Sequence, residues 1–332
     1  TIPMFRLCCV ALLVAAASAV PFTQNQLFPS DAAWLNSEFT QFEARYNRTY
    51  TDDDARTWRM SVFRFNMERA LQLQEENPNA RFGVTKFADW TPEEFAKLQG
   101  KRPSQTSKSD VLTLDEMPTN GADSVDWRKQ GLVTPVKDQG QCGSCWSFGT
   151  TGVIEGAWAK AGNKLTSLSE SEFVDCDKVD GGCDGGDQAD AMDFALKKWK
   201  GQIEPEKDYP YKPKDRKCDR EASDVGATLK SWKEIQHTED ALAAAVAAYG
   251  PITVGVAADN SWQNYQSGVI CKKDKQVDHA VLVVGYDKSA SPPYWIVKNS
   301  WASDWGEDGY IRIEMGKKCY NIQSDAQAAF CQ

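Results

Sequence analysis

The feature that most constrains this chain is a short segment with two cysteines whose chemistry depends on residues far downstream. Residues 139–146 read Gln-Gly-Gln-Cys-Gly-Ser-Cys-Trp, and Cys145 stands near the start of a segment, 143–160, that is typical of a helix. The chain has only two histidines, and His279 opens a Val-rich segment typical of a strand. For the thiol to meet the imidazole, a helical part must face a strand-rich part across a cleft.

Cysteine, histidine and asparagine follow one another in the order expected of a thiol nucleophile, its base and the group that orients the base. These residues are Cys145, His279 and Asn299. A helix N-terminus and a nearby imidazolium favour the thiolate, with a cysteine pKa of roughly 3–4 in such sites against about 8.5 for a free thiol. Upstream, the neutral amide of Gln139 can donate to an oxyanion, together with the Cys145 backbone N–H.

The sequence resembles a cysteine protease precursor of the papain family, in its cathepsin L-like (cruzipain-like) branch. The resemblance rests on residues 142–146, on Val-Asp-His-Ala-Val at 277–281 and on Asn-Ser-Trp at 299–301. It implies an α+β fold of two lobes, one helical and one β-barrel-like, preceded by a helical inhibitory prodomain. It also implies a cysteine endopeptidase that forms a thioester at Cys145 and is made as a zymogen activated at acidic pH.

The charged, helix-prone region 27–100 contains two stretches that resemble the propeptide of this family. The middle of the ERFNIN pattern is matched by Arg59, Phe63 and Asn66, while Ala55, Ala70 and Gln74 replace its usual Glu, Ile and Asn. The second motif is Gly83-x-Thr85-x-Phe87-x-Asp89, with Thr in place of Asn. Protonation of Asp89 and nearby acids at about pH 4–5 is expected to loosen the propeptide. The alternative is an N-terminal helical domain without an inhibitory role.

Three consecutive parts are predicted. Residues 1–19 are typical of a signal peptide, because a basic residue precedes a short apolar run that ends in Ala-Ser-Ala. A retained anchor is the alternative, although the run is short for a membrane span. Residues 20–120 form the predicted inhibitory propeptide, with a polar linker at 101–110 and processing near 118–123. The mature peptidase is predicted at 121–332, with its helical lobe at about 130–230 and its strand-rich lobe at about 231–318.

Within the mature part, helices are predicted at 143–160, 187–200 and 241–248, and strands at 279–286, 294–298 and 309–314. The formal charge of −9 gives no support to nucleic-acid binding. Ten cysteines suit an oxidising compartment. We therefore expect the secretory pathway, with a lysosome-like acidic vesicle or the exterior as destination. The expected partners are polypeptide substrates, the chain's own propeptide and cystatin-like inhibitors, for a monomer without cofactor or metal.

The resemblance also implies a pairing of six cysteines, which sequence alone leaves open. The implied disulfides are Cys142–Cys183, Cys176–Cys218 and Cys271–Cys319. Cys331 is left over, and its near-terminal position predicts an exposed thiol, free or bonded between molecules. Two alternatives use Cys142-x2-Cys145 differently, as a redox pair or as zinc ligands. The sequon at Asn47 is a candidate glycosylation site in the propeptide.

Residues for substrate binding are implied by the same resemblance. They are Gly185, Gly186, Asp187, Gly255, Val277, Asp278, Ala280, Trp301 and Ser324. In this family the second residue before the scissile bond enters the main pocket, whose floor falls at Ser324. We expect Leu or Phe to be preferred there, and Arg to be accepted because Asp187 and Asp325 lie near the rim or floor. The functional alternative is a catalytically silent papain-like binding or storage protein, which usually lacks the nucleophile that Cys145 supplies here.

Overall fold

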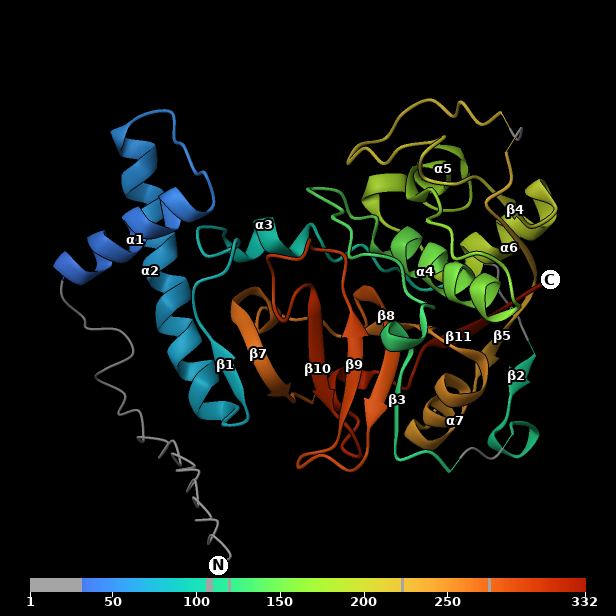
Figure 1. Ribbon diagram of the computed structural model, residues 1–332. Helices are drawn as coiled ribbons and strands as arrows, with labels where there is room; N and C mark the ends of the chain where they lie inside the picture. Colours follow the sequence, from blue (N-terminus) through green and yellow to red (C-terminus); the bar gives the residue numbers. More distant parts are fainter. Residues whose placement is uncertain (1–31, 106–109, 119–120, 222–223, 274–275) are drawn as a thin grey trace, which may run out of the picture.

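The structure is a computed structural model that describes residues 32–105, 110–118, 121–221, 224–273 and 276–332 (Figure 1). The predicted signal peptide, residues 1–19, lies outside the described residues. In the described part of the chain, no helix combines the length and the apolar character needed to cross a bilayer.

The N-terminal region is built on two helices that cross at one end of the molecule (Figure 1). They are α1 (Ala32–Arg45) and α2 (Asp53–Glu76). Their contact is a small aromatic core of Phe39, Phe42 and Phe63 with Met67. The chain then forms a strand, β1 (Ala80–Phe82), and a short helix, α3 (Pro92–Ala96). Figure 1 shows α3 leading over the end of the large sheet toward the second group of helices.

The second group of helices forms one lobe of the remaining chain (Figure 1). It contains α4 (Cys145–Lys160), α5 (Glu170–Cys176) and α6 (Gln188–Trp199). The central helix, α4, is buried along most of its length because it packs against α5, α6 and the strand-rich lobe. Short 3-10 helices lie at Leu114–Glu116, Trp127–Gln130, Gly182–Asp184, Trp262–Asn264 and Cys319–Asn321.

The other lobe is one sheet in which eleven strands are described. Besides β1, they are β2 (Val111–Leu112), β3 (Ser124–Asp126), β4 (Gln202–Ile203), β5 (Ala227–Ile235), β6 (Ile252–Val256), β7 (Tyr265–Ile270), β8 (His279–Asp287), β9 (Tyr294–Lys298), β10 (Tyr310–Glu314) and β11 (Ala326–Cys331). The order is β1-β7-β10-β9-β8-β6-β11-β5-β2, with β3 added to β8 and β4 to β5. Both ends of this order, β1 and β2, precede the predicted processing site.

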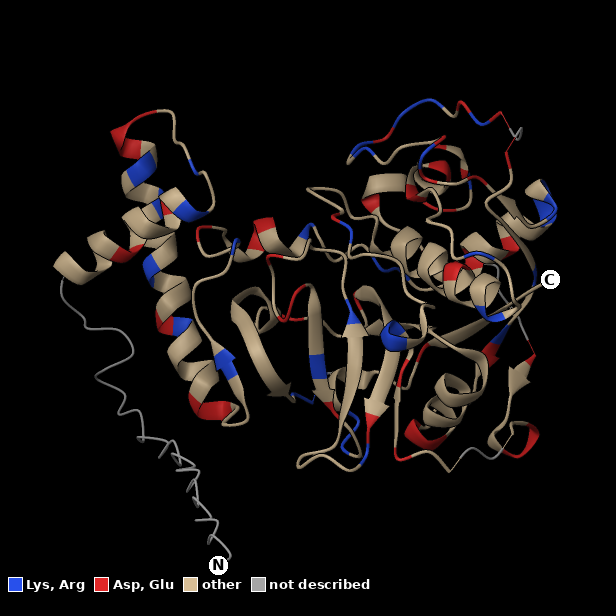
Figure 2. Ribbon diagram, viewed as in Figure 1, with Lys and Arg blue, Asp and Glu red and all other residues tan. Residues whose placement is uncertain are grey.

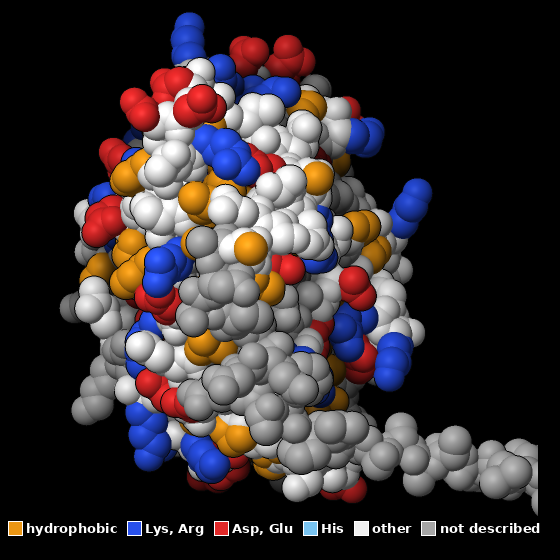
Figure 3. Space-filling view, turned by 90° about the vertical axis from the view of Figure 1, so that its left-hand side faces the viewer, with side chains coloured by type: hydrophobic (Ala, Val, Ile, Leu, Met, Phe, Trp, Pro, Cys, Tyr) orange, Lys and Arg blue, Asp and Glu red, His pale blue; other side chains and the backbone are white. Residues whose placement is uncertain are grey.

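The helix α7 (Glu239–Tyr249) packs against the sheet and carries acidic residues only at its start (Figure 2). The helix α2, by contrast, carries acidic residues at both ends and residues of both charges between them (Figure 2). The face that includes the crossed helices shows both signs of charge among single apolar side chains (Figure 3). This face therefore shows mixed charge rather than a single basic patch (Figure 3).

The predicted α+β fold of two lobes behind a helical prodomain is confirmed, with one correction: the sheet does not close into a barrel. The predicted helices and strands correspond to α4, α6, α7, β8, β9 and β10 within one or two residues at each end. Pattern reasoning did not identify α5, β5, β6, β7 and β11, nor the pairing of β1 and β2 with strands of the mature part.

Disulfides join the three pairs that the resemblance implied, Cys142–Cys183, Cys176–Cys218 and Cys271–Cys319. Cys331 is unpaired, but the expectation of an exposed terminal thiol is wrong. It ends β11, is half-buried, and its Sγ lies 3.8 Å from the Ile154 carbonyl. Burial raises the pKa of Cys331 to about 12.

Candidate active site

The candidate nucleophile, Cys145, is the first residue of α4 and is fully buried. The preceding residue, Ser144, does not cap the helix with its side chain; its hydroxyl contacts the Tyr211 hydroxyl at 2.7 Å. The sulfur therefore lies at the helix end where backbone N–H groups carry partial positive charge. Because Cys142 is bonded to Cys183, the sulfur of Cys145 is free.

The candidate base, His279, is the first residue of β8, and its orientation is fixed by Asn299 directly after β9. The Asn299 Oδ1 atom accepts a hydrogen bond from the Ser300 backbone N–H at 2.8 Å, which identifies it as the carbonyl oxygen. It also lies 2.8 Å from His279 Nε2. A carbonyl oxygen only accepts, so Nε2 carries the proton and Nδ1 is left as the basic nitrogen.

Indole rings enclose this hydrogen bond. Trp301 stacks on the His279 ring with centroids 4.8 Å apart and planes at 28°. Trp262 meets the same ring edge-on at 6.0 Å, and both indoles are buried. The apolar enclosure strengthens the hydrogen bond because it excludes competing water. Sequence reasoning identified Trp301 but missed Trp262, whose local sequence carries no distinguishing pattern.

The side chain of Gln139 is held by both ends of its amide. Its Oε1 accepts from Ser300 Oγ at 2.6 Å and from Trp301 Nε1 at 3.1 Å. Its Nε2 donates to the Cys142 carbonyl at 2.8 Å and to the Leu98 carbonyl at 3.0 Å. The donor predicted for an oxyanion is thus occupied by a carbonyl of the N-terminal region.

The segment after α3 runs through the site and forms backbone hydrogen bonds with it. Lys101 N–H donates to the Asp278 carbonyl at 2.9 Å. Gly186 donates to the Gly100 carbonyl at 2.9 Å and accepts from Arg102 N–H at 2.8 Å, in a parallel arrangement. A Cβ on Gly100 would lie 1.8 Å from the Gly143 carbonyl oxygen, so only glycine fits here.

This covering segment changes the protonation expected of the site. Burial raises the pKa of Cys145 to about 11, while hydrogen bonds from the Ala280 and Gly100 backbone act in the opposite direction. Burial lowers the pKa of His279 to about 4, against the effect of its hydrogen bond to Asn299. In the covered state the thiol and the neutral imidazole are therefore favoured, contrary to the thiolate expected from sequence. The cause is loss of solvent from both groups.

A pocket lies beside the covered Cys145, and it receives the Lys101 side chain of the same segment. Lys101, 7% exposed, contacts the carboxylates of Asp187 and Asp325, the latter at 2.8 Å. Asp187 is 3% exposed and also caps α6 by accepting from the N–H groups of Ala189 and Asp190. The linker predicted at 101–110 is thus wrong for Lys101, and residues 106–109 lie outside the described residues.

The other residues predicted for substrate binding lie around Cys145 and around the pocket of Lys101. A Cβ on Gly255 would lie 2.6 Å from Val277 Cγ1 and 2.7 Å from Asp325 Oδ2. A Cβ on Gly185 would lie 2.5 Å from the Gly100 carbonyl oxygen. Ser324 lines the pocket of Lys101, but its hydroxyl donates to the Asn321 carbonyl at 2.8 Å. The group that faces the bound cation is therefore the carboxylate of Asp325. Ala280 is buried next to His279.

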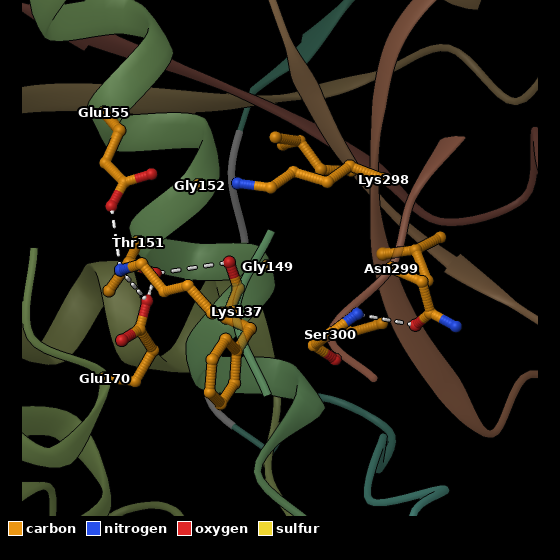
Figure 4. Close-up of a pocket in the computed structure, with 13 residues that line it drawn as sticks. Lys137, Gly149, Thr151, Gly152, Glu155, Glu170, Lys298, Asn299 and Ser300 are labelled. Atoms are coloured by element: carbon orange, nitrogen blue, oxygen red, sulfur yellow. Dashed lines mark hydrogen bonds and ion pairs between the residues drawn. The ribbon is translucent and has the colours of Figure 1, made fainter. Parts of the chain in front are cut away.

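Behind Asn299, a polar cluster joins the two lobes (Figure 4). Lys137 Nζ lies 3.1 Å from Glu155 and 2.6 Å from Glu170. Thr134 Oγ1 donates to Glu155 at 2.6 Å and accepts from Lys298 Nζ at 3.0 Å. Since Lys298 directly precedes Asn299, this chain of contacts anchors the end of β9 to α4. Sequence reasoning missed the cluster because its members come from separate segments.

The described part of the chain offers no group of side chains that is free to bind a metal ion. The one group of candidate ligands with metal-like spacing there is Cys271, Glu314 and Cys319, and its two cysteines are joined in a disulfide. His237, the other histidine, is exposed and contacts Glu234 at 2.7 Å just before α7. Because Cys142 is bonded to Cys183, it is not available to bind zinc or to form a redox pair with Cys145.

In the N-terminal region, the residues of the two motifs hold α2 to the following loop. Asn66 Nδ2 donates to the carbonyls of Ala88 and Trp90, both at 2.8 Å. Arg59 binds both carboxylate oxygens of Glu94 at 2.6 and 2.7 Å. The Arg59 guanidinium is the main cause that lowers the pKa of Glu94.

Asp89 behaves differently from Glu94. Burial raises its pKa, although Arg48 and the Tyr50 hydroxyl act against this. A carboxylate whose pKa is raised by folding takes up its proton more readily in the folded state. The raised pKa of Asp89 therefore gives no support to the expectation that its protonation loosens the propeptide. The pKa of Glu94 is lowered instead, so of these two carboxylates it is Glu94 whose protonation in acid weakens the folded region.

Comparison with known proteins agrees with this geometry. Residues 121–330 match the papain family of cysteine proteases, and residues 39–95 match the cathepsin propeptide inhibitor domain. A cysteine proteinase of Trypanosoma brucei brucei is 40% identical over 96% of this chain and 72% of its own length. Cysteine proteinase A of Leishmania mexicana is 42% identical over 87% of this chain and 83% of its own.

Among solved structures, digestive procathepsin L2 proteinase from the larval midgut of Tenebrio molitor matches with a TM-score of 0.82 and 33% identity. The match covers 89% of this chain and 99% of that structure. Fold and site together define a thiol protease precursor whose own N-terminal region fills its cleft. The chain belongs to the papain family of cysteine proteases and carries a cathepsin propeptide inhibitor domain.

Proposed function

We propose that Cys145 is the nucleophile of a cysteine endopeptidase, with His279 as its base and Asn299 as the residue that orients the base. The observation that carries this assignment is the pair of hydrogen bonds on Asn299 Oδ1, from Ser300 N–H and His279 Nε2–H. They leave His279 Nδ1 to take the proton of the thiol. Once the cleft is open to water, the cost of charging both groups falls, and the helix N-terminus favours the thiolate.

The reaction then proceeds in two stages. The thiolate attacks the carbonyl carbon of the scissile peptide, and the negative charge that forms on oxygen is bound by Gln139 Nε2 and the Cys145 backbone N–H. His279 gives its proton to the departing amine as the C–N bond breaks, which leaves a thioester. A water molecule that loses its proton to His279 attacks the thioester and releases the acid product.

The propeptide is the chain's own inhibitor, and we propose that acid releases it. In support, the Leu98 carbonyl occupies the Gln139 donor, and the Arg59–Glu94 pair connects α2 to the helix that leads into the cleft. Maturation near residues 118–123 would then occur in a lysosome-like acidic vesicle or outside the cell. The mature enzyme would act as a monomer on polypeptides and be open to cystatin-like inhibitors. A glycan at Asn47, which is exposed, would be lost with the propeptide.

Titration of the matured enzyme with a thiol-directed epoxysuccinyl inhibitor tests this function against the catalytically silent alternative. One mole of inhibitor per mole of enzyme should abolish peptide hydrolysis, and the modified residue should be Cys145. The variant Cys145→Ser should fold, bind its propeptide and lack activity, since the hydroxyl is a far weaker nucleophile. Substantial turnover in purified Cys145→Ser, or no labelling of the wild type, would refute the assignment.

A further inference from the structure

The pocket beside Cys145 has an unusual division of charge between the propeptide and the mature part. Its lining includes three acids from the mature part, Asp187, Glu234 and Asp325. The bases that line it, Lys101 and Arg102, both come from the propeptide. Among the described lining residues, the mature part supplies no Lys or Arg. When the propeptide leaves, the pocket therefore keeps its acids and loses its cations.

Two carboxylates hold the ammonium group of Lys101 from different parts of the chain. Asp187 caps α6 in the helical lobe, and Asp325 directly precedes β11 in the strand-rich lobe. Both contact the same Nζ atom, and the Lys101 side chain is 3% exposed. Burial alone would disfavour the ammonium, but Asp325 and Asp187 outweigh it and raise the pKa of Lys101. A buried cation is thus stable only because two anions meet it.

The pocket is shaped for a long side chain that ends in a charge. Val277 lines its wall, and the missing side chain of the adjacent Gly255 leaves the Asp325 carboxylate free to face the pocket. The backbone of Lys101 is fixed at the same time, by its hydrogen bond to Asp278 and by the Gly100 and Arg102 bonds to Gly186. The propeptide therefore presents Lys101 as a side chain held in a cleft by its main chain, as a peptide substrate would be.

We infer that the mature enzyme selects polypeptides with Lys or Arg in this pocket, through the paired carboxylates of Asp187 and Asp325. This inference rests on the proposed function and replaces the preference for Leu or Phe expected from sequence, because the residue facing the bound side chain is Asp325 rather than Ser324. An apolar side chain would leave two carboxylates in the pocket without a cation, which is unfavourable.

The test is a series of fluorogenic peptides that differ only in the second residue before the scissile bond: Lys, Arg, norleucine, Leu and Phe. Norleucine has the apolar chain of Lys without its ammonium, so the Lys-to-norleucine ratio of kcat/KM isolates the charge. We expect this ratio to be roughly 10 or more, and Lys or Arg to exceed Leu and Phe, because a charge-assisted hydrogen bond in a buried site contributes this much. The comparison of Lys with Arg shows which base fits better.

Two variants keep the fold while removing one charge each. Asp187→Asn retains a good helix cap, and Asp325→Asn retains an acceptor for the Gln327 amide that now contacts Asp325. Each should bring the Lys-to-norleucine ratio of kcat/KM down toward 1, because one of the two anions that hold the ammonium is lost. Asp240→Asn is the control, because Asp240 is exposed on α7 and does not line this pocket.

Active-site titration of each preparation separates the possible failures. If the enzyme titrates and cleaves the norleucine peptide at least as well as the Lys and Arg peptides, the specificity inference is wrong and the proposed function stands. If the enzyme neither titrates nor cleaves any peptide, both are wrong. A Lys-to-norleucine ratio that survives both Asp→Asn changes would also overturn the assignment to these two residues.

Discussion

Replacement of Glu94 by Gln should make the precursor activate at a pH where the wild type stays latent. Glu94 accepts two hydrogen bonds from Arg59 of α2 and one, at 2.9 Å, from the Thr91 N–H in a capping box at the start of α3. Gln preserves the capping box but removes the charge. The change therefore weakens the link between α2 and the helix that leads into the cleft while leaving α3 intact.

The expected loss of propeptide stability can be judged from how exposed the Arg59–Glu94 pair is. The side chains of Arg59 and Glu94 are 24% and 32% exposed, between a surface pair and a buried one. Exposed pairs contribute about 0.2–1 kcal/mol and charge-assisted hydrogen bonds about 1.5–3 kcal/mol. We expect a loss of about 1–2 kcal/mol in propeptide stability. That corresponds to roughly 5-fold to 30-fold more opened precursor at neutral pH.

The pH dependence has a definite sign. Folding lowers the pKa of Glu94 from its ordinary value of 4.5, so its contribution is fully present above that pH and is lost as the pH falls through the lowered value. The variant lacks this contribution at every pH. Its advantage in activation rate should therefore be largest at neutral pH and disappear in strong acid.

The assay measures the rate at which precursor shortens to the mature form between pH 3 and 7, with a trace of active enzyme added to each sample. Glu93→Gln is the matched control, since Glu93 is an exposed acid in the same first turn of α3. Identical pH profiles for Glu94→Gln and the wild type would refute the reasoning. So would an equal shift in Glu93→Gln, because general loss of acidic charge would then explain the effect.

Three further predictions concern the site and the free thiol. Gly100→Ala should leave the uncut precursor partly active in inhibitor titration at neutral pH, since its Cβ would overlap Gly143 at a cost of about 1–3 kcal/mol; an unchanged titre would contradict this. Asn299→Ala should lower kcat by roughly 10-fold to 100-fold with little change in KM, because His279 loses its orienting hydrogen bond; wild-type kcat would exclude that role. After Cys145 is blocked, Cys331 should react slowly with a disulfide reagent in native enzyme and rapidly in denaturant, since burial raises its pKa to about 12; fast native labelling would show that β11 frays.

Local patterns were sufficient to predict the elements that hold the proposed catalytic residues. The helix predicted at 143–160 and the strand predicted at 279–286 agree with α4 and β8 within two residues, the strand because it is a continuous Val-rich run. The same holds for Asn299 at the end of β9, where motif and strand coincide.

Long-range contacts could not be predicted in this way. Lys101 stands in a polar run, and nothing near it in sequence indicates that Asp187 and Asp325 will meet it. Pairing of β1 with β7 depends likewise on a partner nearly two hundred residues away. Motif chemistry describes an open cleft, whereas in the precursor the chain covers Cys145 and burial raises the pKa of its thiol to about 11.

The position of β1 and β2 at the two ends of the strand order has a consequence for solubility. In the precursor the outer sides of β7 and β5 are hydrogen-bonded to propeptide strands, at Tyr265–Gly268 and at Glu234–Ile235. Processing at the proposed site near residues 118–123 would remove both partners and so uncover backbone N–H and C=O groups at the two ends of this strand order (Figure 1). Such borders can template pairing with strands of other molecules. In the precursor, β1 and β2 cover both borders of the sheet, and the proposed processing would expose them.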